Sequence, residues 1–221
     1  MSDQTGLDAN DAYGGRKPTS HESRAGQPWD ASYIGEPAPW DIGRPQPAIL
    51  RLAREGAFAG RVLDAGCGTG ENALELASLG LRVLGVDVAE TAVSMAREKA
   101  QARGLDASFV VGDALNLGHL GERFDSVLDC GLFHSFDLDA ERRAYATNLA
   151  VVTNPGARLF VLCFSDSGPE LSPHPISEGE LQETFAPQCG WRVISIAPDR
   201  IEARFAVEGV PAWLATAERV G

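Results

Sequence analysis

The sequence predicts an α/β fold in which a mostly parallel β-sheet carries helices on both faces. Short apolar runs typical of strands alternate with segments whose apolar residues recur at helical spacing. Such alternation is typical of β-α-β units, whose strands pair in parallel. Runs such as FVLCF at 160–164 carry no charge, as expected of a sheet that is buried on both faces. Ligands of such folds bind beyond the carboxyl ends of the strands.

The expected elements follow one another along most of the chain, and turn residues separate them. Glycines end two of the helices, and a capping box of Ser177 and Glu180 begins a short one. Helices are expected at residues 47–55, 71–79, 91–103 and 139–152. Strands are expected at 61–65, 82–88, 107–111, 124–130 and 158–164, with closing strands at 191–196, within 201–205 and at 213–218.

The beginning of the chain divides into two parts of different composition. Residues 1–27 are rich in Ser, Asp, Asn, Gly and Gln, so we expect a disordered tail. The domain is expected to span residues 28–221. Its first segment, 28–47, places Trp29, Tyr33 and Trp40 among prolines, and we expect this segment to form an N-terminal lid whose aromatic walls exclude water.

Composition excludes several classes of partner. The 221 residues carry a formal net charge of −12, which disfavours nucleic acid because binding to phosphates depends on Lys and Arg. No apolar run is long enough to cross a membrane, and no secretory signal is expected. The four cysteines and four histidines show no metal-ligand spacing, so we expect reduced thiols, no metal and a cytoplasmic location. A small molecule is the expected partner, and the oligomeric state is left open.

The loop DAGCGTG at 64–70 is the most specific motif, because it lies between a strand and a helix. A dinucleotide-binding loop reads G-x-G-x-x-G. Here the third glycine, Gly70, comes one residue early, and Glu71 stands in its place. A pyrophosphate would meet the Glu71 carboxylate, whereas the cationic sulfonium and the zwitterionic amino-acid part of S-adenosylmethionine (SAM) need no phosphate site. The spacing therefore favours SAM over NAD.

Two aspartates follow the next two strands. Asp87 ends the second strand, where its carboxylate is expected to accept hydrogen bonds from both ribose hydroxyls, although an Asp in this place also caps helices. Asp113 follows the third strand and is expected to accept from an adenine amino group, with a simple turn as the alternative.

The segment DCGLFHS at 129–135 ends the fourth strand, where the substrate is expected to meet the cofactor. His134 is a candidate base or a hydrogen-bond partner of the substrate, and a purely structural histidine is the alternative.

These motifs resemble a known family. Residues 61–164 are similar to the class I SAM-dependent methyltransferases at all four motif positions. The segment PWDIGRPQP at 39–47 resembles the lid of the thiopurine and halide/thiol methyltransferases. Together with LDAGCG, FDSVLDCGLFHS and PGARLFVLCFSD, it looks like the bacterial heterocyclic-toxin methyltransferases. DNA and protein-amide methyltransferases carry an Asn/Asp-Pro-Pro-aromatic motif after the fourth strand, which this sequence lacks.

The resemblance implies a class I methyltransferase (Rossmann-like) fold with a seven-stranded, mostly parallel sheet. It implies methyl transfer from SAM to a ring nitrogen or hydroxyl of a small (hetero)aromatic molecule such as a hydroxyquinolone, with S-adenosyl-L-homocysteine (SAH) as product and detoxification as a role. The expected acceptor-site residues are Trp29, Tyr33, Phe133 and His134, of which His134 is the catalytic candidate. The expected cofactor-binding residues are Trp40, Gly43, Asp64, Ala65, Gly66, Cys67, Gly68, Gly70, Asp87, Val88, Asp113, Ala114 and Asp129.

Other functions stay open at this stage. A thiol, halide or sugar-hydroxyl methyltransferase is the main alternative, and a non-catalytic SAM-binding protein or an NAD-dependent oxidoreductase are the others.

Overall fold

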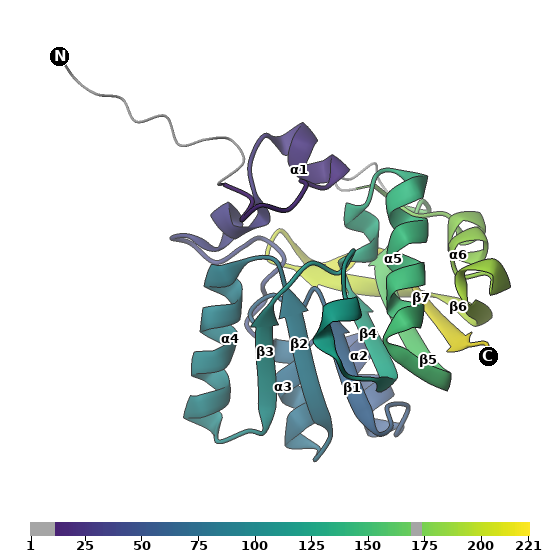
Figure 1. Cartoon of the computed structure of the whole chain (residues 1–221). Coiled ribbons are helices and arrows are strands. Elements are labelled where there is room, and N and C mark those ends of the chain that lie inside the picture. The colour runs from purple at the N-terminus through teal and green to yellow at the C-terminus, as the bar shows by residue number, and fades with distance from the viewer. Residues whose placement is uncertain (1–11, 169–173) are drawn as a thin grey trace.

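The computed structural model describes residues 12–168 and 174–221, and its centre is one β-sheet (Figure 1). The seven strands of the sheet lie in the order β3-β2-β1-β4-β5-β7-β6. The first five strands pair in parallel, and β7 runs antiparallel to both of its neighbours. Their bounds are β1 Arg61–Ala65, β2 Arg82–Asp87, β3 Ala107–Val111, β4 Phe124–Cys130, β5 Thr153–Phe164, β6 Trp191–Ala203 and β7 Ala206–Arg219. The expected α/β fold with a mostly parallel sheet is confirmed.

The helices cover both faces of the sheet, and each face has its own apolar cluster. Tyr145 and Leu181 pack on one face, and Ile49, Leu74 and Val93 pack on the other. Successive strand residues alternate between the two clusters, as the period of two residues requires. The α-helices are α1 Ser20–Ala25, α2 Pro47–Arg54, α3 Glu71–Ser78, α4 Glu90–Arg103, α5 Asp139–Val151 and α6 Glu178–Thr184. Short 3₁₀-helices are η1 Trp29–Tyr33, η2 Gly118–Leu120, η3 Phe133–Ser135 and η4 Pro187–Cys189.

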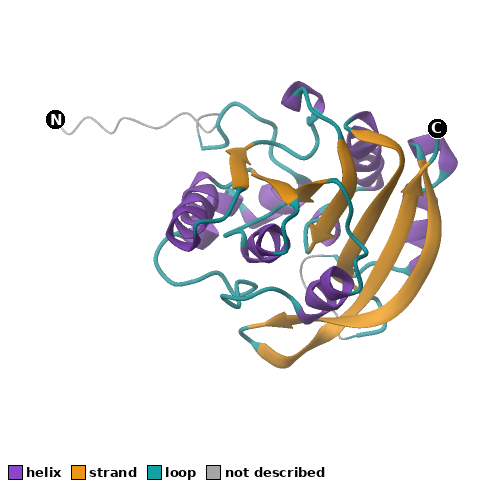
Figure 2. Ribbon diagram, turned by 90° about the horizontal axis from the view of Figure 1, so that it is seen from below, coloured by secondary structure: helices purple, strands orange, loops and turns teal. Residues whose placement is uncertain are grey.

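The strands after α5 differ most from expectation. The runs 191–196 and 201–205 were expected to be separate, but β6 is a single strand from Trp191 to Ala203 with two register shifts against β7. Pro198 lies within it, which an edge strand tolerates because the missing N–H removes no bond from a central ladder. The long, curved strands beside the C-terminus form this edge of the sheet (Figure 2).

The beginning of the chain also differs from expectation. The expected disorder over 1–27 is wrong for residues 12–27, which carry α1, and residues 1–11 lie outside the described part. Thr19 and Glu22 form a capping box, and the buried Glu22 also binds the Arg16 guanidinium. Because polar contacts rather than apolar packing hold this segment, a search for core-forming residues misses it.

Two contacts fix α1 on the body of the protein. The Ser20 N–H donates to Glu141 of α5 at 2.8 Å, and the Arg24 guanidinium pairs with Asp137. As a result, α1 lies above the carboxyl ends of the strands (Figure 1).

Candidate active site

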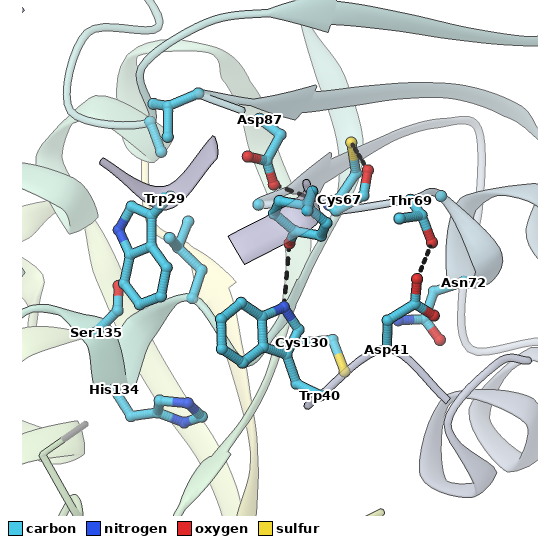
Figure 3. A pocket seen from close by; sticks show the side chains of 18 of the residues that line it. Trp29, Trp40, Asp41, Cys67, Thr69, Asn72, Asp87, Cys130, His134 and Ser135 are labelled. Atoms are coloured by element: carbon cyan, nitrogen blue, oxygen red, sulfur yellow. Dashed lines mark hydrogen bonds between the residues drawn. The ribbon is translucent and has the colours of Figure 1, made fainter. Parts of the chain in front are cut away.

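A cavity of about 610 Å³ lies at the carboxyl ends of the central strands, where the fold predicts a ligand site. One wall comes from the glycine loop and the ends of β2 and β3, and the other from the lid, the end of β4 and α1. Trp29, Trp40 and His134 face the same space as Asp87 and Cys67 (Figure 3). The residues expected in the site that line this cavity are Trp29, Tyr33, Trp40, Gly66, Cys67, Gly68, Gly70, Asp87, Val88, Asp113, Ala114 and His134.

The glycine loop is held against β2 by its own backbone. The N–H groups of Gly66 and Cys67 both donate to the carbonyl of Val86. Gly66, Gly68 and Gly70 have φ values of +72°, +51° and +85°, which side chains rarely adopt. A Cβ on Gly66 would lie 2.8 Å from the Cβ of Leu132. The sequence at this turn is therefore dictated by backbone conformation and close packing together.

Asp87 connects the glycine loop to the start of α4. Its Oδ2 accepts from the Gly68 N–H at 2.8 Å, and its Oδ1 accepts from the Ala89 N–H at 2.9 Å. Burial raises the pKa of this carboxyl, and the backbone donors oppose the rise. Each oxygen keeps a second lone pair, so the helix-capping role does not prevent Asp87 from accepting hydrogen bonds from a ligand that lies in the cavity.

Asp113, Val88 and Ala114 line the far end of the same wall. Asp113 Oδ1 accepts from the Leu115 N–H at 2.9 Å, which forms the turn that the sequence left as the alternative. One carboxylate oxygen remains available toward the cavity, so the turn and the expected adenine contact are compatible.

Three expected cofactor residues lie behind the cavity wall instead of on it. Asp64, Ala65 and Asp129 are at most 1% exposed. Asp129 accepts from the N–H groups of Leu132 and Phe133 and from the Tyr145 hydroxyl at 2.7 Å, so it shapes the turn after β4. Burial raises its pKa to about 7.

Asp64 is different, because neither of its buried carboxylate oxygens has a partner among the described residues. Burial and the charge of Asp129 raise its pKa to about 8. Asp64 lies in β1 two residues before Gly66, which lines the cavity, so it stands just behind this wall. An ammonium group in the cavity would supply the missing partner. Together with the space in front of Gly68, where a Cβ would lie 3.2 Å from the Tyr33 hydroxyl, this fits the amino-acid part of SAM.

His134 reaches the cavity from η3, and its surroundings fix its protonation. Its Nδ1 accepts from the Phe164 N–H at 2.9 Å, and its ring stacks on Phe164 with centroids 4.1 Å apart. Burial and the histidines His21 and His174 lower its pKa to about 3. A neutral ring whose Nδ1 accepts must carry its proton on Nε2, so His134 offers a hydrogen-bond donor.

Phe133, the neighbour of His134, was expected in the cavity and does not line it. Its ring is fully buried against Tyr145 and Phe185 in the core beneath α5. In the tight turn of η3 adjacent side chains point to different sides, so one of the two residues enters the core while the other reaches the ligand side.

The lid forms the aromatic part of the opposite wall. Trp40 meets Trp29 and Tyr33 edge to face, with centroids 5.6 and 6.1 Å apart, and its Nε1–H donates to the Tyr33 hydroxyl at 3.1 Å. Asp41 accepts from the Thr69 hydroxyl at 2.7 Å, which ties the lid to the glycine loop (Figure 3). Gly43, expected to bind cofactor, lies outside this cavity and lines a smaller pocket beside the lid.

Sequence reasoning missed part of the wall. Thr19 and His21 line the cavity from the segment expected to be disordered, and Phe205 lines it from the turn between β6 and β7. The sequence signal for Thr19 and His21 was a capping box, in which Thr19 is followed three residues later by Glu22. Nothing local in the sequence indicates Phe205, because only the fold of the sheet edge brings it to the site.

Within residues 12–168 and 174–221, no three His, Cys, Asp or Glu side chains are grouped so as to hold a metal ion. No helix in these ranges is long and apolar enough to span a membrane.

Comparison with known proteins agrees with this geometry. Residues 62–156 match the family model described as a methyltransferase domain. The chain is 39% identical over 186 residues to 2-heptyl-1-hydroxyquinolin-4(1H)-one methyltransferase of Mycobacteroides abscessus, covering 79% of this chain and 81% of that one. It is 30% identical over 180 residues to probable thiol methyltransferase 2 of Arabidopsis thaliana, covering 78% and 77%.

Among solved structures, one was determined in work on the conversion of a disulfide bond into a thioacetal group during echinomycin biosynthesis. It superposes with a TM-score of 0.77 at 41% identity and covers 86% of this chain and 87% of that one. These relatives cover between 78% and 86% of this chain and are methyltransferases by name where a name is given, so the NAD-dependent alternative is set aside. The chain belongs to the class I SAM-dependent methyltransferases.

Proposed function

We propose that this methyltransferase transfers the methyl group of SAM to an oxygen or ring nitrogen of a small heteroaromatic acceptor. One observation carries the proposal: the wall opposite the glycine loop is built from the flat side chains of Trp29, Trp40, His134 and Phe164. Flat rings stack on such walls, where the contact area is large and water is excluded. The hydroxyquinolone methyltransferase from M. abscessus supports this acceptor class.

SAM would lie along the opposite wall. Its ribose hydroxyls would donate to Asp87, its adenine amino group to Asp113, and its ammonium group would pair with Asp64. When bound, SAM supplies an activated methyl group on a sulfonium. The contribution of the protein is to hold the acceptor in line with that methyl group, which is worth several kcal/mol of barrier, about 7 or more at best.

The lid would close this arrangement. The Thr69 hydroxyl donates to Asp41, and the Tyr33 hydroxyl would lie 3.2 Å from a Cβ on Gly68, so this segment contacts the glycine loop directly and would enclose the acceptor and the cofactor together. Its apolar surface would keep water from competing for the space between the acceptor and the methyl group.

A sulfur acceptor is the second candidate. The likeness to a thiol methyltransferase from A. thaliana, and to the structure associated with thioacetal formation, favours it. Both candidates use the same cofactor wall and differ only in what lies against the aromatic rings.

The experiment is a panel of hydroxyquinolones, phenols, thiols and halides incubated with radiolabelled SAM and the full chain. We expect the highest kcat/KM with the hydroxyquinolones. An Asp87→Ala variant serves as a control for transfer that depends on the cofactor site. Turnover confined to thiols would reverse the ranking of the candidates, and SAM binding without turnover of any member would favour a non-catalytic SAM-binding protein.

The same proposal covers partners and location. The net charge of −12 argues against a nucleic acid as acceptor. The four cysteines, Cys67, Cys130, Cys163 and Cys189, are all unpaired, which supports a reducing compartment such as the cytoplasm.

A further inference from the structure

His134 presents a donor, and not an acceptor, to the cavity. Its Nδ1 is occupied by the Phe164 N–H, so the Nε2–H is the group left for a ligand. The Nε2 edge of the ring lies beside Gly131, another cavity residue, since a Cβ there would lie 4.0 Å from Nε2. A ring held in this way does not take a proton from an acceptor at Nε2, because that position already carries one.

A second histidine on the same cavity has the same arrangement. His21 of α1 lines the cavity and stacks on Trp29, with centroids 4.7 Å apart and an interplanar angle of 7°. Its Nδ1 lies 3.0 Å from the guanidinium of Arg24. A guanidinium can only donate, so Nδ1 accepts and the proton of the neutral ring is on Nε2. Burial and the charge of Arg24 lower the pKa of His21, which keeps the ring neutral.

His21 and His134 line the same cavity, although the residues come from α1 and η3. Trp29, on which His21 stacks, and His134 lie on the same side of this cavity (Figure 3). The contacts of Ser20 and Arg24 with Glu141 and Asp137 hold α1 in this place. Two N–H donors therefore belong to the aromatic part of the cavity wall.

The remaining titratable groups on the described cavity wall do not offer a base in this region. Asp41 accepts from Thr69, and Glu71 pairs with Lys99 and Arg103. Asp87 and Asp113 lie on the wall assigned to SAM, whose ribose hydroxyls and adenine amino group would occupy their free acceptor positions. Tyr33, Cys67 and Cys130 have pKa values raised by burial, so they stay protonated. The one further charged lining residue, Arg44, pairs with Glu202.

We propose that His21 and His134 form a two-donor site that binds the acceptor as its conjugate base, through the oxygen of an ionised heteroaromatic hydroxyl or N-hydroxyl group. This inference rests on the proposed function and specifies its acceptor. The acceptor hydroxyl loses its proton to solvent before transfer. The bond from its oxygen, or from a ring nitrogen that shares the negative charge, to the methyl carbon then forms as the carbon–sulfur bond breaks, and the electron pair of that bond stays on sulfur. An anion and a cation thereby become two neutral centres, so no protein base is needed.

Paired variants separate a donor from a base. His134→Gln keeps an N–H donor near the position of Nε2, whereas His134→Asn keeps an acceptor for the Phe164 N–H and places no donor in the cavity. We expect His134→Asn to lower kcat/KM for a hydroxyquinolone on the order of 10- to 100-fold and His134→Gln to lower it far less, because a hydrogen bond to an anion is among the strong ones. Equal losses in both variants would overturn the donor role.

Variants that keep or remove the N–H donor can be compared in the same way at His21 of α1. His21→Phe keeps the stack on Trp29 and removes the donor, and His21→Gln keeps a donor. We expect the acceptor KM to rise about 10-fold in His21→Phe only. His119→Gln, at an exposed position that does not line the cavity, is the matched control and should leave the acceptor KM unchanged. Unchanged SAM affinity in every variant shows that the fold is intact, and an unchanged acceptor KM in His21→Phe would remove His21 from the site.

The pH dependence tests the ionised acceptor directly. In a series of 1-hydroxyquinolin-4-ones whose ring substituents shift the acidity of the hydroxyl, we expect the pH of half-maximal kcat/KM to follow the pKa of each acceptor. The midpoint should persist in His134→Asn at lower amplitude. A midpoint that is constant across the series and disappears in His134→Asn would identify His134 as a base and overturn the inference while leaving the proposed function intact. Absence of turnover with every hydroxylated acceptor would overturn both.

Discussion

The two walls of the cavity are built in different ways. The proposed cofactor wall, from the glycine loop to Asp113, consists of strand ends and the turns that follow them, and its backbone is hydrogen-bonded into the sheet. The proposed acceptor wall combines the N-terminal segment, the lid and the turn after β4, which are joined through side chains. The Trp29 N–H donates to Glu22, and the Asp137 N–H donates to the Ser20 hydroxyl. Changes on the first wall should therefore disturb folding and cofactor binding, and changes on the second should affect the acceptor alone.

The largest effect is expected from Gly66→Ala on the cofactor wall. The new Cβ would lie 2.8 Å from that of Leu132 at a φ of +72°, so both packing and backbone are strained. We expect the free energy of unfolding to fall by about 2–4 kcal/mol. Urea denaturation measures it.

Gly43→Ala is the matched control on the lid. Its φ is +68°, but nothing lies within 4 Å of the new Cβ, so the loss should be only about 1 kcal/mol. Equal losses in the two variants would show that backbone strain alone sets the cost and that the close approach to Leu132 is unimportant.

Asp87→Ala should act mainly on the cofactor. The variant removes an acceptor from the cavity and also the bond that orders Gly68, so we expect SAM binding to weaken by about 1–3 kcal/mol, measured by calorimetry. Asp106→Ala, on the exposed surface before β3, should bind SAM like the parent. If Asp87→Ala bound SAM with unchanged affinity, the carboxylate would be only a helix cap.

Asp64 should make the stability of the ligand-free protein depend on pH. Burial raises its pKa from 3.8 to about 8, so between these values the folded state binds more protons than the unfolded state. The free energy of unfolding therefore falls as pH rises through this window. Asp64→Asn should reduce the loss between pH 5 and pH 8 by about 3–4 kcal/mol, measured by urea denaturation at both pH values.

Asp129 is the internal comparison for that measurement. It is equally buried and has a pKa of about 7, so part of the pH dependence should remain in Asp64→Asn. Saturating SAM should restore stability at pH 8 in the parent, because an ammonium group would offset the Asp64 charge. A pH dependence identical in the parent and Asp64→Asn would assign the whole effect to other carboxyl groups.

The contrast between the walls also explains what the sequence could predict. The positions of the glycine loop, Asp87 and Asp113 on the cavity wall could be predicted because strand, turn and helix signals are local and their order fixes where these residues lie on the sheet edge. Phe133 was misplaced because the sequence does not indicate which of two adjacent residues in a 3₁₀ turn enters the core. His21 was missed because its place depends on Ser20 and Arg24 reaching residues more than 100 positions away.

The smallest effect is expected at Thr19, where the acceptor wall is held by a single cap. Thr19→Ala removes the hydroxyl that accepts from the Glu22 N–H and should destabilise α1 by about 1 kcal/mol. Because α1 is attached to the sheet by a few polar contacts, this loss should appear as local opening of residues 19–25 and leave the global unfolding transition unchanged. Hydrogen exchange of the α1 amides measures the local opening, and urea denaturation measures the global transition.

Thr19→Ser keeps the cap and is the control. We expect the acceptor KM to rise a few-fold in Thr19→Ala and the SAM affinity to stay constant. A fall in global stability equal to the local one would show instead that α1 unfolds together with the sheet, and the two walls would then form one cooperative unit.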